Sequence, residues 1–578
     1  MTNLFELYRS PEAPISHVNW AWNMYGAGVE NIGRLGKPES LPVPSPASDQ
    51  LLVRVDAVSL CLSDVKLITQ GGKHPKLYDR DLAKEPTRLG HEVSLTVMQV
   101  GEKLQKQFQP GQRLAIQPDI YQNGKSTAYG YTIPGGLIQF HLIGDEVMQG
   151  DAGSYILPID GEIGYAEAAL TEPWACVTAA YTQRRRLTPK PGGAMWILGR
   201  PGDLTEYQFS AHLHAPATII VTDIPAGLLS RIEKEVTTRE AILIVRDNLP
   251  LMDYPALRRE FGGGFDDIVY LDPRSAQCVS AAARLIARRG TFNLVGRTPL
   301  DGNPQIDVGR IHYDYTAYLG TCGSDIAAAY GEVRNRCELR SGGVAIFVGA
   351  GGPMGQMHLQ RALEMPNGPA TILATDVNDV RLDALRARFR PLARKCDKRL
   401  VISNSANESL YEFVMRETNQ CGVDDSVVCV PSSKVMEETA QTLSHDGMLV
   451  LFAGVSNGTF ASLNLSDVYL HNAQFTGTSG SALADQLSVI RSTLAGELSP
   501  NQSVAAIGGI EAALDGIRAM MAGRYPGKII IFPQIRGLPL TSLPELKTTA
   551  PKVAEHLVAG DVWTRDTESA LIEKFWKP

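Results

Sequence analysis

Short apolar segments alternate with longer amphipathic segments through the middle of the chain. Residues 217–222 and 371–375 are two of the apolar segments, rich in β-branched residues, and an aspartate follows each of them, Asp223 or Asp376. Strands of this kind alternating with helices are typical of a parallel sheet that helices cover on both faces. The pattern therefore predicts an α/β fold with doubly wound, Rossmann-like domains.

The middle of the chain also repeats itself. Three pairs of segments match in the same order along the sequence: 192–199 with 342–349, 264–269 with 422–427, and 320–324 with 477–481. The offset between partners drifts only from about 150 to about 158 residues, which is typical of a duplicated domain. We therefore predict two tandem Rossmann-like domains, one at residues 189–340 and one at residues 341–500.

The two expected domains differ at the turn that follows their first strand. A dinucleotide-binding turn needs glycines for a tight bend and for close approach of the backbone to the pyrophosphate, and it opens a helix. Residues 349–355 read Gly-Ala-Gly-Gly-Pro-Met-Gly, whereas residues 199–203 read Gly-Arg-Pro-Gly-Asp, with a proline for the middle glycine and an added acidic residue. We predict that the second domain binds the cofactor and that the first has degenerated.

The expected cofactor site includes the acidic residue at the end of the second strand. A carboxylate there accepts hydrogen bonds from the adenosine ribose and repels a 2′-phosphate, so Asp376 favours NAD(H) over NADP. The predicted cofactor-binding residues are Gly349, Gly351, Gly352, Gly355, Asp376, Gly477 and Thr478.

Composition limits the partners that we expect. The chain has 578 residues, 44% of them hydrophobic, which suggests about three or four domains. The net charge is −7 with dispersed basic residues, and no apolar run approaches the roughly 20 residues that span a bilayer. We therefore expect small-molecule substrates and a homo-oligomer, but neither nucleic acid nor a membrane. Eight cysteines, none in a Cys-x-x-Cys arrangement and without a preceding signal peptide, favour a reducing, cytoplasmic location.

Candidate metal ligands lie before these domains. Cys61 and His91 supply the thiolate and imidazole that zinc prefers, and a catalytic zinc takes three protein ligands while leaving one position open. Either Glu92 or Glu172 can provide the third ligand as a carboxylate. The sequence therefore predicts one catalytic zinc ion.

Two residues that follow Cys61 fit supporting roles. Ser63 can pass a proton between a metal-bound oxygen and solvent, and Asp64 can accept a hydrogen bond from the far nitrogen of His91. The predicted catalytic residues are Cys61, Ser63, Asp64, His91, Glu92 and Glu172. Cationic candidates to bind a phosphate or carboxylate on the substrate are Lys66, Lys73, His74 and Lys76.

These motifs resemble the zinc-dependent alcohol and polyol dehydrogenases of the medium-chain dehydrogenase/reductase superfamily. The resemblance extends over nearly all of the chain, and its main segments are residues 59–64, 89–92, 100–101, 108–113 and 172–176. The chain particularly resembles sorbose-1-phosphate reductases, which share the Ser-Leu-Cys-Leu-Ser run at residues 59–63 and the Phe-Gln-Pro-Gly-Gln-Arg run at residues 108–113.

The resemblance implies a split, β-rich catalytic domain of the GroES-like type. Residues 1–188 would form its larger part, and residues 501–578 would return to it, with residues 527–533 as a closing strand and a helical tail. Many members of the superfamily carry a second, structural zinc on a loop with four cysteines. No cysteine falls between Cys61 and Cys176 here, so we expect that second zinc to be absent.

The implied function is that of a zinc-dependent, NAD(H)-linked oxidoreductase that interconverts a secondary alcohol and a ketone on a sugar, polyol or sugar phosphate. A zinc- and NAD-dependent isomerase or epimerase, which would oxidise and re-reduce the same substrate, is an alternative. A non-catalytic assembly protein would require a damaged metal motif, and the motif around Cys61 and His91 is intact.

Overall fold

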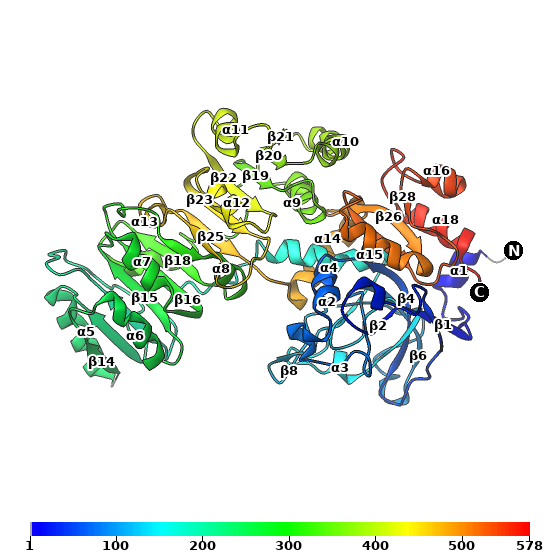
Figure 1. The fold of residues 1–578 in the computed structure, drawn as a ribbon, viewed down its shortest axis with the longest axis horizontal. Helices are drawn as coiled ribbons and strands as arrows, with labels where there is room; N and C mark the ends of the chain where they lie inside the picture. The colour runs from blue at the N-terminus through cyan, green and yellow to red at the C-terminus, as the bar shows by residue number, and fades with distance from the viewer. Residues whose placement is uncertain (1–2, 240) are drawn as a thin grey trace. The chain divides into compact units, whose positions relative to one another are not determined.

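The computed structural model of the protein describes residues 3–239 and 241–578. The chain forms two compact units. Unit 1 combines Met1–Thr178 with Gly480–Pro578, and unit 2 consists of Ala179–Ser479, so the chain leaves unit 1 once and later returns to it (Figure 1). No helix among the described residues is long and apolar enough to cross a membrane.

Unit 1 is built on a mostly antiparallel eight-stranded sheet. Its strands are, in spatial order, β11 (Ile156–Pro158), β7 (Arg113–Ile116), β6 (Glu92–Val100), β4 (Leu51–Ser59), β27 (Lys528–Phe532), β26 (Val504–Gly509) and β28 (Thr541–Ser542), with β10 (Phe140–Ile143) paired to β4. Strand β4 is buried along its whole length, and its two charged residues satisfy each other because Arg54 Nε donates to Asp56 Oδ1 at 2.7 Å. This pairing matters because an unpaired buried charge would be strongly destabilising.

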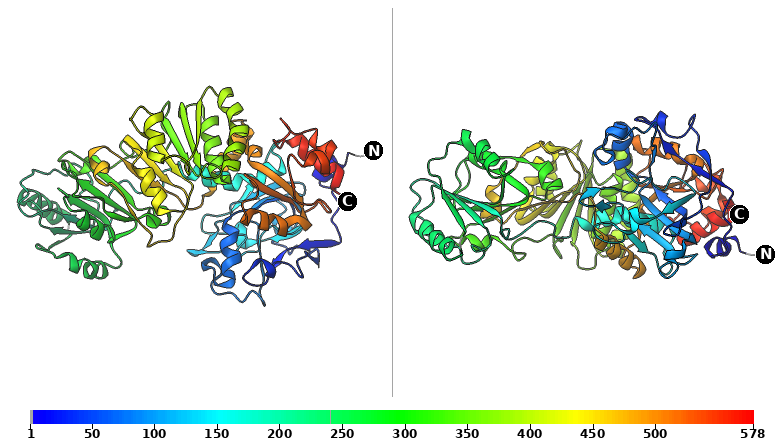
Figure 2. Two further views of the ribbon diagram at one scale, coloured as in Figure 1. Left: turned by 45° about the horizontal axis from the view of Figure 1, so that its top comes forward. Right: turned by 90° about the horizontal axis from the view of Figure 1, so that it is seen from below.

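The C-terminal segment of the chain completes this sheet. Strand β27 pairs antiparallel with β4, so that Ile530 lies opposite Ser59, two residues before Cys61. The helices of unit 1 are α1 (Leu4–Arg9), α2 (Ser63–Gln70), α3 (Asp145–Met148), α4 (Tyr165–Ala179), α14 (Leu483–Leu494), α15 (Ala513–Met521), α16 (Leu546–Thr549), α17 (Pro551–Ala554) and α18 (Arg565–Phe575). Helices α1 and α18 pack together, so the two ends of the chain lie side by side (Figures 1 and 2).

Unit 2 contains two six-stranded parallel sheets with the same strand order. The first half of the unit, residues 194–321, forms the sheet β14 (Ile242–Val245), β13 (Thr218–Thr222), β12 (Ala194–Leu198), β15 (Phe265–Leu271), β16 (Ile286–Val295) and β18 (Ala317–Thr321). The second half, residues 344–479, forms the sheet β21 (Arg399–Asn404), β20 (Thr371–Asp376), β19 (Val344–Val348), β22 (Val423–Val428), β23 (Leu443–Leu451) and β25 (Gln474–Gly477). Taken along the chain, each order is that of a doubly wound nucleotide-binding sheet.

The helices of the two halves correspond except in one place. The first half has α5 (Ala226–Arg239), α6 (Tyr254–Glu260), α7 (Ala276–Ala283) and α8 (Val308–Tyr313), and the second has α9 (Pro353–Glu364), α10 (Asp379–Lys395), α11 (Leu410–Glu417), α12 (Ser433–Ala440) and α13 (Ser466–Leu470). Helix α9 directly follows the glycine turn after β19, whereas residues 199–217 connect β12 to β13 without any helix. The first half therefore lacks the helix N-terminus that binds pyrophosphate in such folds.

The two halves of unit 2 share one interface. Strand β17 (Gln305–Asp307) of the first half pairs antiparallel with β24 (Phe460–Ser462) of the second, with Ile306 opposite Ala461. Helix α8 packs against β25, and α13 packs against β18 (Figure 1). Apolar residues from both halves meet in a single buried cluster there, so the edges of the two sheets cover each other.

Candidate active site

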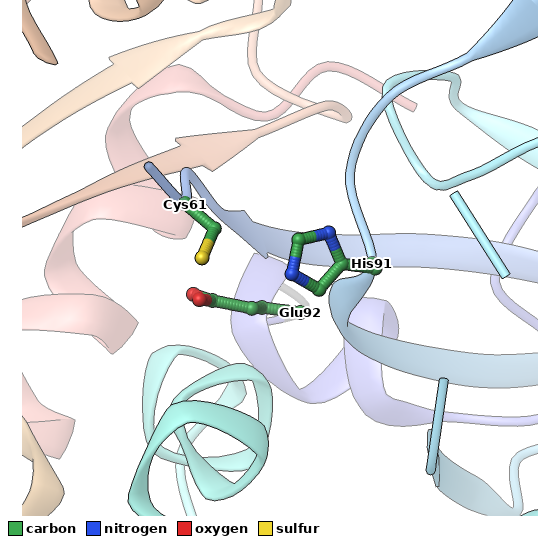
Figure 3. Close-up of side chains that lie close together, drawn as sticks. All are labelled: Cys61, His91 and Glu92. Atoms are coloured by element: carbon green, nitrogen blue, oxygen red, sulfur yellow. The ribbon is translucent and has the colours of Figure 1, made fainter. Parts of the chain in front are cut away.

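Three candidate zinc ligands converge at one end of the neighbouring strands β4 and β6. Cys61 lies just after β4, His91 just before β6, and Glu92 is the first residue of β6. Because these strands are antiparallel, with Ser59 opposite Glu92, the end of one meets the start of the other. Sulfur, nitrogen and oxygen atoms of Cys61, His91 and Glu92 all lie within 4.8 Å of one another (Figure 3). This donor set suits zinc.

Asp64 and Ser63, both at the start of helix α2, lie against these ligands. Asp64 Oδ1 is 3.2 Å from His91 Nδ1, which leaves Nε2 of the ring facing Cys61 and Glu92. Burial lowers the pKa of His91, but the Asp64 carboxylate and Cys61 outweigh burial and raise it well above its ordinary value. Ser63 Oγ donates to Cys61 Sγ at 3.2 Å and lies 3.4 Å from His91 Nε2.

The carboxylate of Glu92 is shared with a lysine from the C-terminal strand. Lys528 Nζ donates to Glu92 Oε1 at 2.7 Å, and both side chains are buried. Burial lowers the pKa of Lys528, but Glu92 outweighs burial and raises it. The other oxygen of Glu92, Oε2, is buried and has no hydrogen-bond partner among the described residues, so it is available to a metal ion.

Glu172, the other candidate ligand, lies on helix α4 and outside the group of three. It is buried, and Cys176 Sγ donates to its Oε1 at 3.7 Å. Burial raises the pKa of Glu172 to about 7, with His91 opposing this shift and Glu92 and Asp119 adding to it. The charges of His91 and Glu92 therefore influence Glu172, and a buried carboxylate with a raised pKa suits a proton acceptor.

A polar wall, which joins three of the predicted cationic candidates to two residues that the sequence did not single out, lies beside His91. The ring centroid of Tyr131 is 5.8 Å from that of His91 and 5.3 Å from that of His74. Lys76 Nζ lies 4.8 Å from the centre of the Tyr131 ring and donates to Asp119 Oδ1 at 2.7 Å. We define this polar wall as Lys66, His74, Lys76, Asp119 and Tyr131.

The cationic candidates divide between this wall and open surface. Burial lowers the pKa of His74, and the charges of Lys76 and Lys66 lower it further, so both lysines lie close to the imidazole. Lys66 is exposed on helix α2, three residues after Ser63, and therefore on the same side of the helix. Lys73 is exposed.

Two of the missed residues left a signal in the sequence. Lys528 begins a run of buried apolar residues, and a lysine in such a position has to be paired. Tyr131 belongs to a Gly-Tyr-Thr-Ile-Pro run at residues 130–134, whose glycine and proline mark a turn without indicating any role for the tyrosine. Asp119 and Cys176 left no signal, because their positions near the ligands depend on the fold.

The glycine turn of the second half is tightly packed around Asp376. Gly349 has a φ of +78°, and a Cβ on Gly355 would lie 2.4 Å from Gly349 O. A Cβ on Gly351 would lie 2.6 Å from Asp376 Oδ2, to which Gly351 N donates at 3.0 Å. Gly352 caps the N-terminus of α9. The N-terminus of α9, which has no side-chain cap, therefore lies beside the buried carboxylate of Asp376. This arrangement suits a dinucleotide.

The corresponding turn of the first half is closed by its own side chains. Arg200 Nε donates to Asp272 Oδ2 at 2.8 Å, and Asp203 accepts hydrogen bonds from Thr205 and Tyr207. Asp223 accepts from the backbone N–H of Asn248 at 2.9 Å. Asp376 of the second half likewise accepts from backbone, from Gly351 N and Asn378 N, so the halves differ in the engaged Arg200 and Asp203 side chains and in the missing helix that would orient a phosphate.

Comparison with known proteins agrees with this organisation. Residues 47–179 match the alcohol dehydrogenase GroES-like domain. The chain is 31% identical to L-sorbose 1-phosphate reductase of Klebsiella pneumoniae over 303 residues, which cover 50% of this chain and 72% of the relative. It is 28% identical to mannitol-1-phosphate 5-dehydrogenase of Aliivibrio fischeri, over 49% of this chain and 70% of the relative.

A solved structure supports the same fold. The 2R,3R-butanediol dehydrogenase of Bacillus subtilis superimposes with a TM-score of 0.50 at 13% identity, and the match covers 89% of this chain and 99% of that one.

Proposed function

Since the chain belongs to the medium-chain dehydrogenase/reductase superfamily, among its zinc-dependent polyol dehydrogenases, we propose that it uses one zinc ion and NAD(H) to interconvert a secondary alcohol and a ketone. The observation that carries the proposal is the group formed by Cys61, His91 and Glu92. Family membership makes the chain an oxidoreductase of the polyol and sugar class. The proposal adds that the chain binds zinc, that it binds one zinc ion, and that its cofactor is NAD(H) rather than NADP.

The residues around the ligands support proton transfer. A zinc ion held by Cys61, His91 and Glu92 would lower the pKa of a substrate hydroxyl. Ser63 Oγ, within 3.4 Å of two ligand atoms, would accept the released proton and pass it towards solvent. Asp64 holds the His91 ring in the orientation that presents Nε2. Lys528 balances the charge of Glu92.

The second half of unit 2 would bind the cofactor. The uncapped N-terminus of α9 would offer its first backbone N–H groups to the pyrophosphate, Gly349, Gly351 and Gly352 would leave room for its approach, and Asp376 would accept hydrogen bonds from the ribose. Hydride transfer itself is the chemistry of the nicotinamide. The first half, a repeat of the second, would bind no nucleotide because it has neither the turn nor the helix.

The substrate would be a sugar, a polyol or a sugar phosphate. Two relatives are named for sugar or polyol phosphates. Lys66, which has no ion-pair partner among the described residues, would bind a phosphate on a substrate whose reacting oxygen lies at the metal ligands.

Metal analysis coupled to an NAD-linked assay tests the proposal. The purified protein should contain one zinc per chain and reduce NAD with polyols or sugar phosphates. Cys61→Ser should lose zinc and activity together, because a hydroxyl is a far poorer zinc ligand than a thiolate. Glu172→Gln should retain its zinc, because Glu172 lies outside the group of three.

Three results would contradict the proposal. Activity that persists after chelation, with zinc verified absent, would remove the metal from the reaction. Two zinc ions per chain would refute single occupancy. A product formed without net change in NADH would favour an isomerase.

A further inference from the structure

The interface between the two halves of unit 2 is reciprocal. Strand β17 pairs with β24, its own repeat counterpart, while α8 packs on β25 and the corresponding helix α13 packs on β18. An arrangement in which the same elements contact each other from both sides is that of a twofold-symmetric dimer. Here both partners belong to one chain.

Two pairs of closely packed residues follow the same symmetry. A Cβ on Gly477 would lie 2.9 Å from His312 Cα, and a Cβ on Gly320 would lie 2.8 Å from Tyr469 Cα. Gly477 is the repeat counterpart of Gly320, and Tyr469 is that of His312, at the same offset of about 157 residues. In each half a glycine thus lets the helix of the other half approach the end of the last strand.

On one side of this interface, the first half reaches two strand ends of the cofactor sheet. Tyr315 Oη donates to Ser479 O at 2.9 Å and accepts from Ser479 N at 3.4 Å. His312 Nδ1 donates to Leu451 O at 3.0 Å, at the end of β23. Ligands of doubly wound sheets bind outside the carboxyl ends of the strands. Tyr315 therefore holds the backbone that follows Gly477 and Thr478, two predicted cofactor-binding residues.

The unusual backbone conformation of Tyr315 indicates that its side chain has a specific role. Tyr315 has a φ of +54°, in the left-handed region that bulky residues rarely adopt because it strains the backbone. Its repeat counterpart, Asn472, has a φ of +58° and is of a type that tolerates this conformation. The first half keeps a tyrosine where an asparagine would fit more easily, and the tyrosine hydroxyl is what reaches Ser479.

We propose that the first half of unit 2 acts as an in-chain partner subunit for the second. In this arrangement Tyr315 and His312 are positioning residues that hold the 477–479 backbone and the end of β23 in the shape required by the nicotinamide end of the dinucleotide. The inference rests on the proposed function, because it requires the second half to bind NAD(H). It gives the half without a nucleotide site a role in binding the cofactor.

The repeat provides a matched control for the test. Tyr315→Phe removes the hydroxyl that contacts Ser479 and keeps the ring. Tyr469→Phe removes a hydroxyl contact on the other side of the interface, where Tyr469, the counterpart of His312, donates from Oη to Thr298 O at 2.7 Å, after strand β16 of the first half. Calorimetry on the intact, zinc-loaded chain should give an NADH Kd about three- to tenfold higher for Tyr315→Phe, as expected for one lost hydrogen bond, and nearly unchanged for Tyr469→Phe.

AMP serves as a probe for the adenosine end of the site. Its Kd should be the same in Tyr315→Phe and in the unaltered protein, because the contact to Ser479 lies at the far strands of the sheet. Equal NADH affinities in Tyr315→Phe and the unaltered protein would overturn the inference. So would equal weakening in the two variants, or a parallel loss of AMP affinity, since these results indicate general damage. Failure of the unaltered protein to bind NADH would instead overturn the proposed function.

Discussion

At the scale of single residues, the environment of each charge determines how the candidate active site works. The carboxylate of Glu92 is fully buried, and Lys528 compensates its charge by donating to one of its oxygens at 2.7 Å. The other oxygen stays available to a metal ion. Glu172 is also buried but forms no salt bridge among the described residues, and burial raises its pKa to about 7 against the opposing charges of His91 and Lys528. Two similar carboxylates therefore have different surroundings and suit different tasks.

Removing the Lys528 charge should destabilise the protein strongly. In zinc-free Lys528→Met, Glu92 would remain as an uncompensated buried charge, which costs about 3–5 kcal/mol of unfolding free energy. Lys103→Met is the control, because the Lys103–Asp49 pair is exposed and solvent screens it. Denaturant unfolding of both variants measures the difference. Similar losses in the two would show that the Lys528–Glu92 pair does not compensate the buried charge.

Binding of a phosphate group on the substrate should depend on Lys66. In Lys66→Ala we expect kcat/KM for a sugar phosphate to fall about tenfold, because a charge-assisted hydrogen bond is lost. The unphosphorylated sugar should react as before. Lys73→Ala, on the exposed connection after the same helix, should leave both substrates unaffected. If Lys66→Ala slowed both substrates equally, Lys66 would not be a phosphate ligand.

At the scale of elements, the two halves of unit 2 show how one strand order can serve different purposes. Both have six parallel strands in the same order. Only β19 leads through a glycine turn directly into a helix, while β12 leads into residues 199–217 without one. The replaced glycine at Pro201 and the added Asp203 indicated a degenerate turn. The missing helix was not predicted, because the sequence of a connection does not reveal that a neighbouring element has been lost.

Substituting the aspartate that ends the second strand should separate the two halves functionally. Asp376→Ala should weaken NAD binding about tenfold to a hundredfold and relax discrimination against NADP, since a charged acceptor for the ribose hydroxyls is lost. Asp223→Ala should change neither property. Titration calorimetry with both cofactors distinguishes the variants. The reverse pattern would assign the nucleotide to the first half, and two saturable sites per chain would assign one to each.

At the scale of the whole molecule, the described chain has two compact units, and unit 2 has an internal interface. Each half covers the sheet edge of the other, and an exposed edge would invite pairing with another chain. A homo-oligomer, which the composition led us to expect and which stays a prediction, would therefore have to form through other surfaces.

The internal interface should contribute directly to stability. Ile306 is fully buried in β17, opposite Ala461 of β24. Ile306→Asp should lower the unfolding free energy by more than about 3 kcal/mol, because an unpaired charge would be buried, whereas Ile306→Val should cost about 0.5–1.5 kcal/mol. Thermal unfolding compares the two. An unchanged midpoint in Ile306→Asp would mean that the contact between the halves does not stabilise the protein.

The sequence by itself determined the features that depend on short stretches of neighbouring residues. The superfamily is confirmed, because residues 47–179, which contain the local motifs around Cys61, His91 and Glu172, match the alcohol dehydrogenase GroES-like domain, and the chain is 31% identical to a sugar-phosphate reductase over 303 residues. The parallel, Rossmann-like sheets were predictable because apolar periodicity reports strands directly. The ligand assignments stay predictions, and the sequence left Glu92 and Glu172 as equal candidates.

Only the tertiary structure decided which distant residues meet. Glu92 rather than Glu172 joins Cys61 and His91 because β4 and β6 are antiparallel neighbours, a pairing that spacing along the chain does not specify. Lys528 reaches Glu92 from more than 400 residues away because β27 pairs with β4. Tyr315 reaches Ser479 through the interface between the halves of unit 2. Such contacts depend on how elements pack, and packing is a property of the folded chain as a whole.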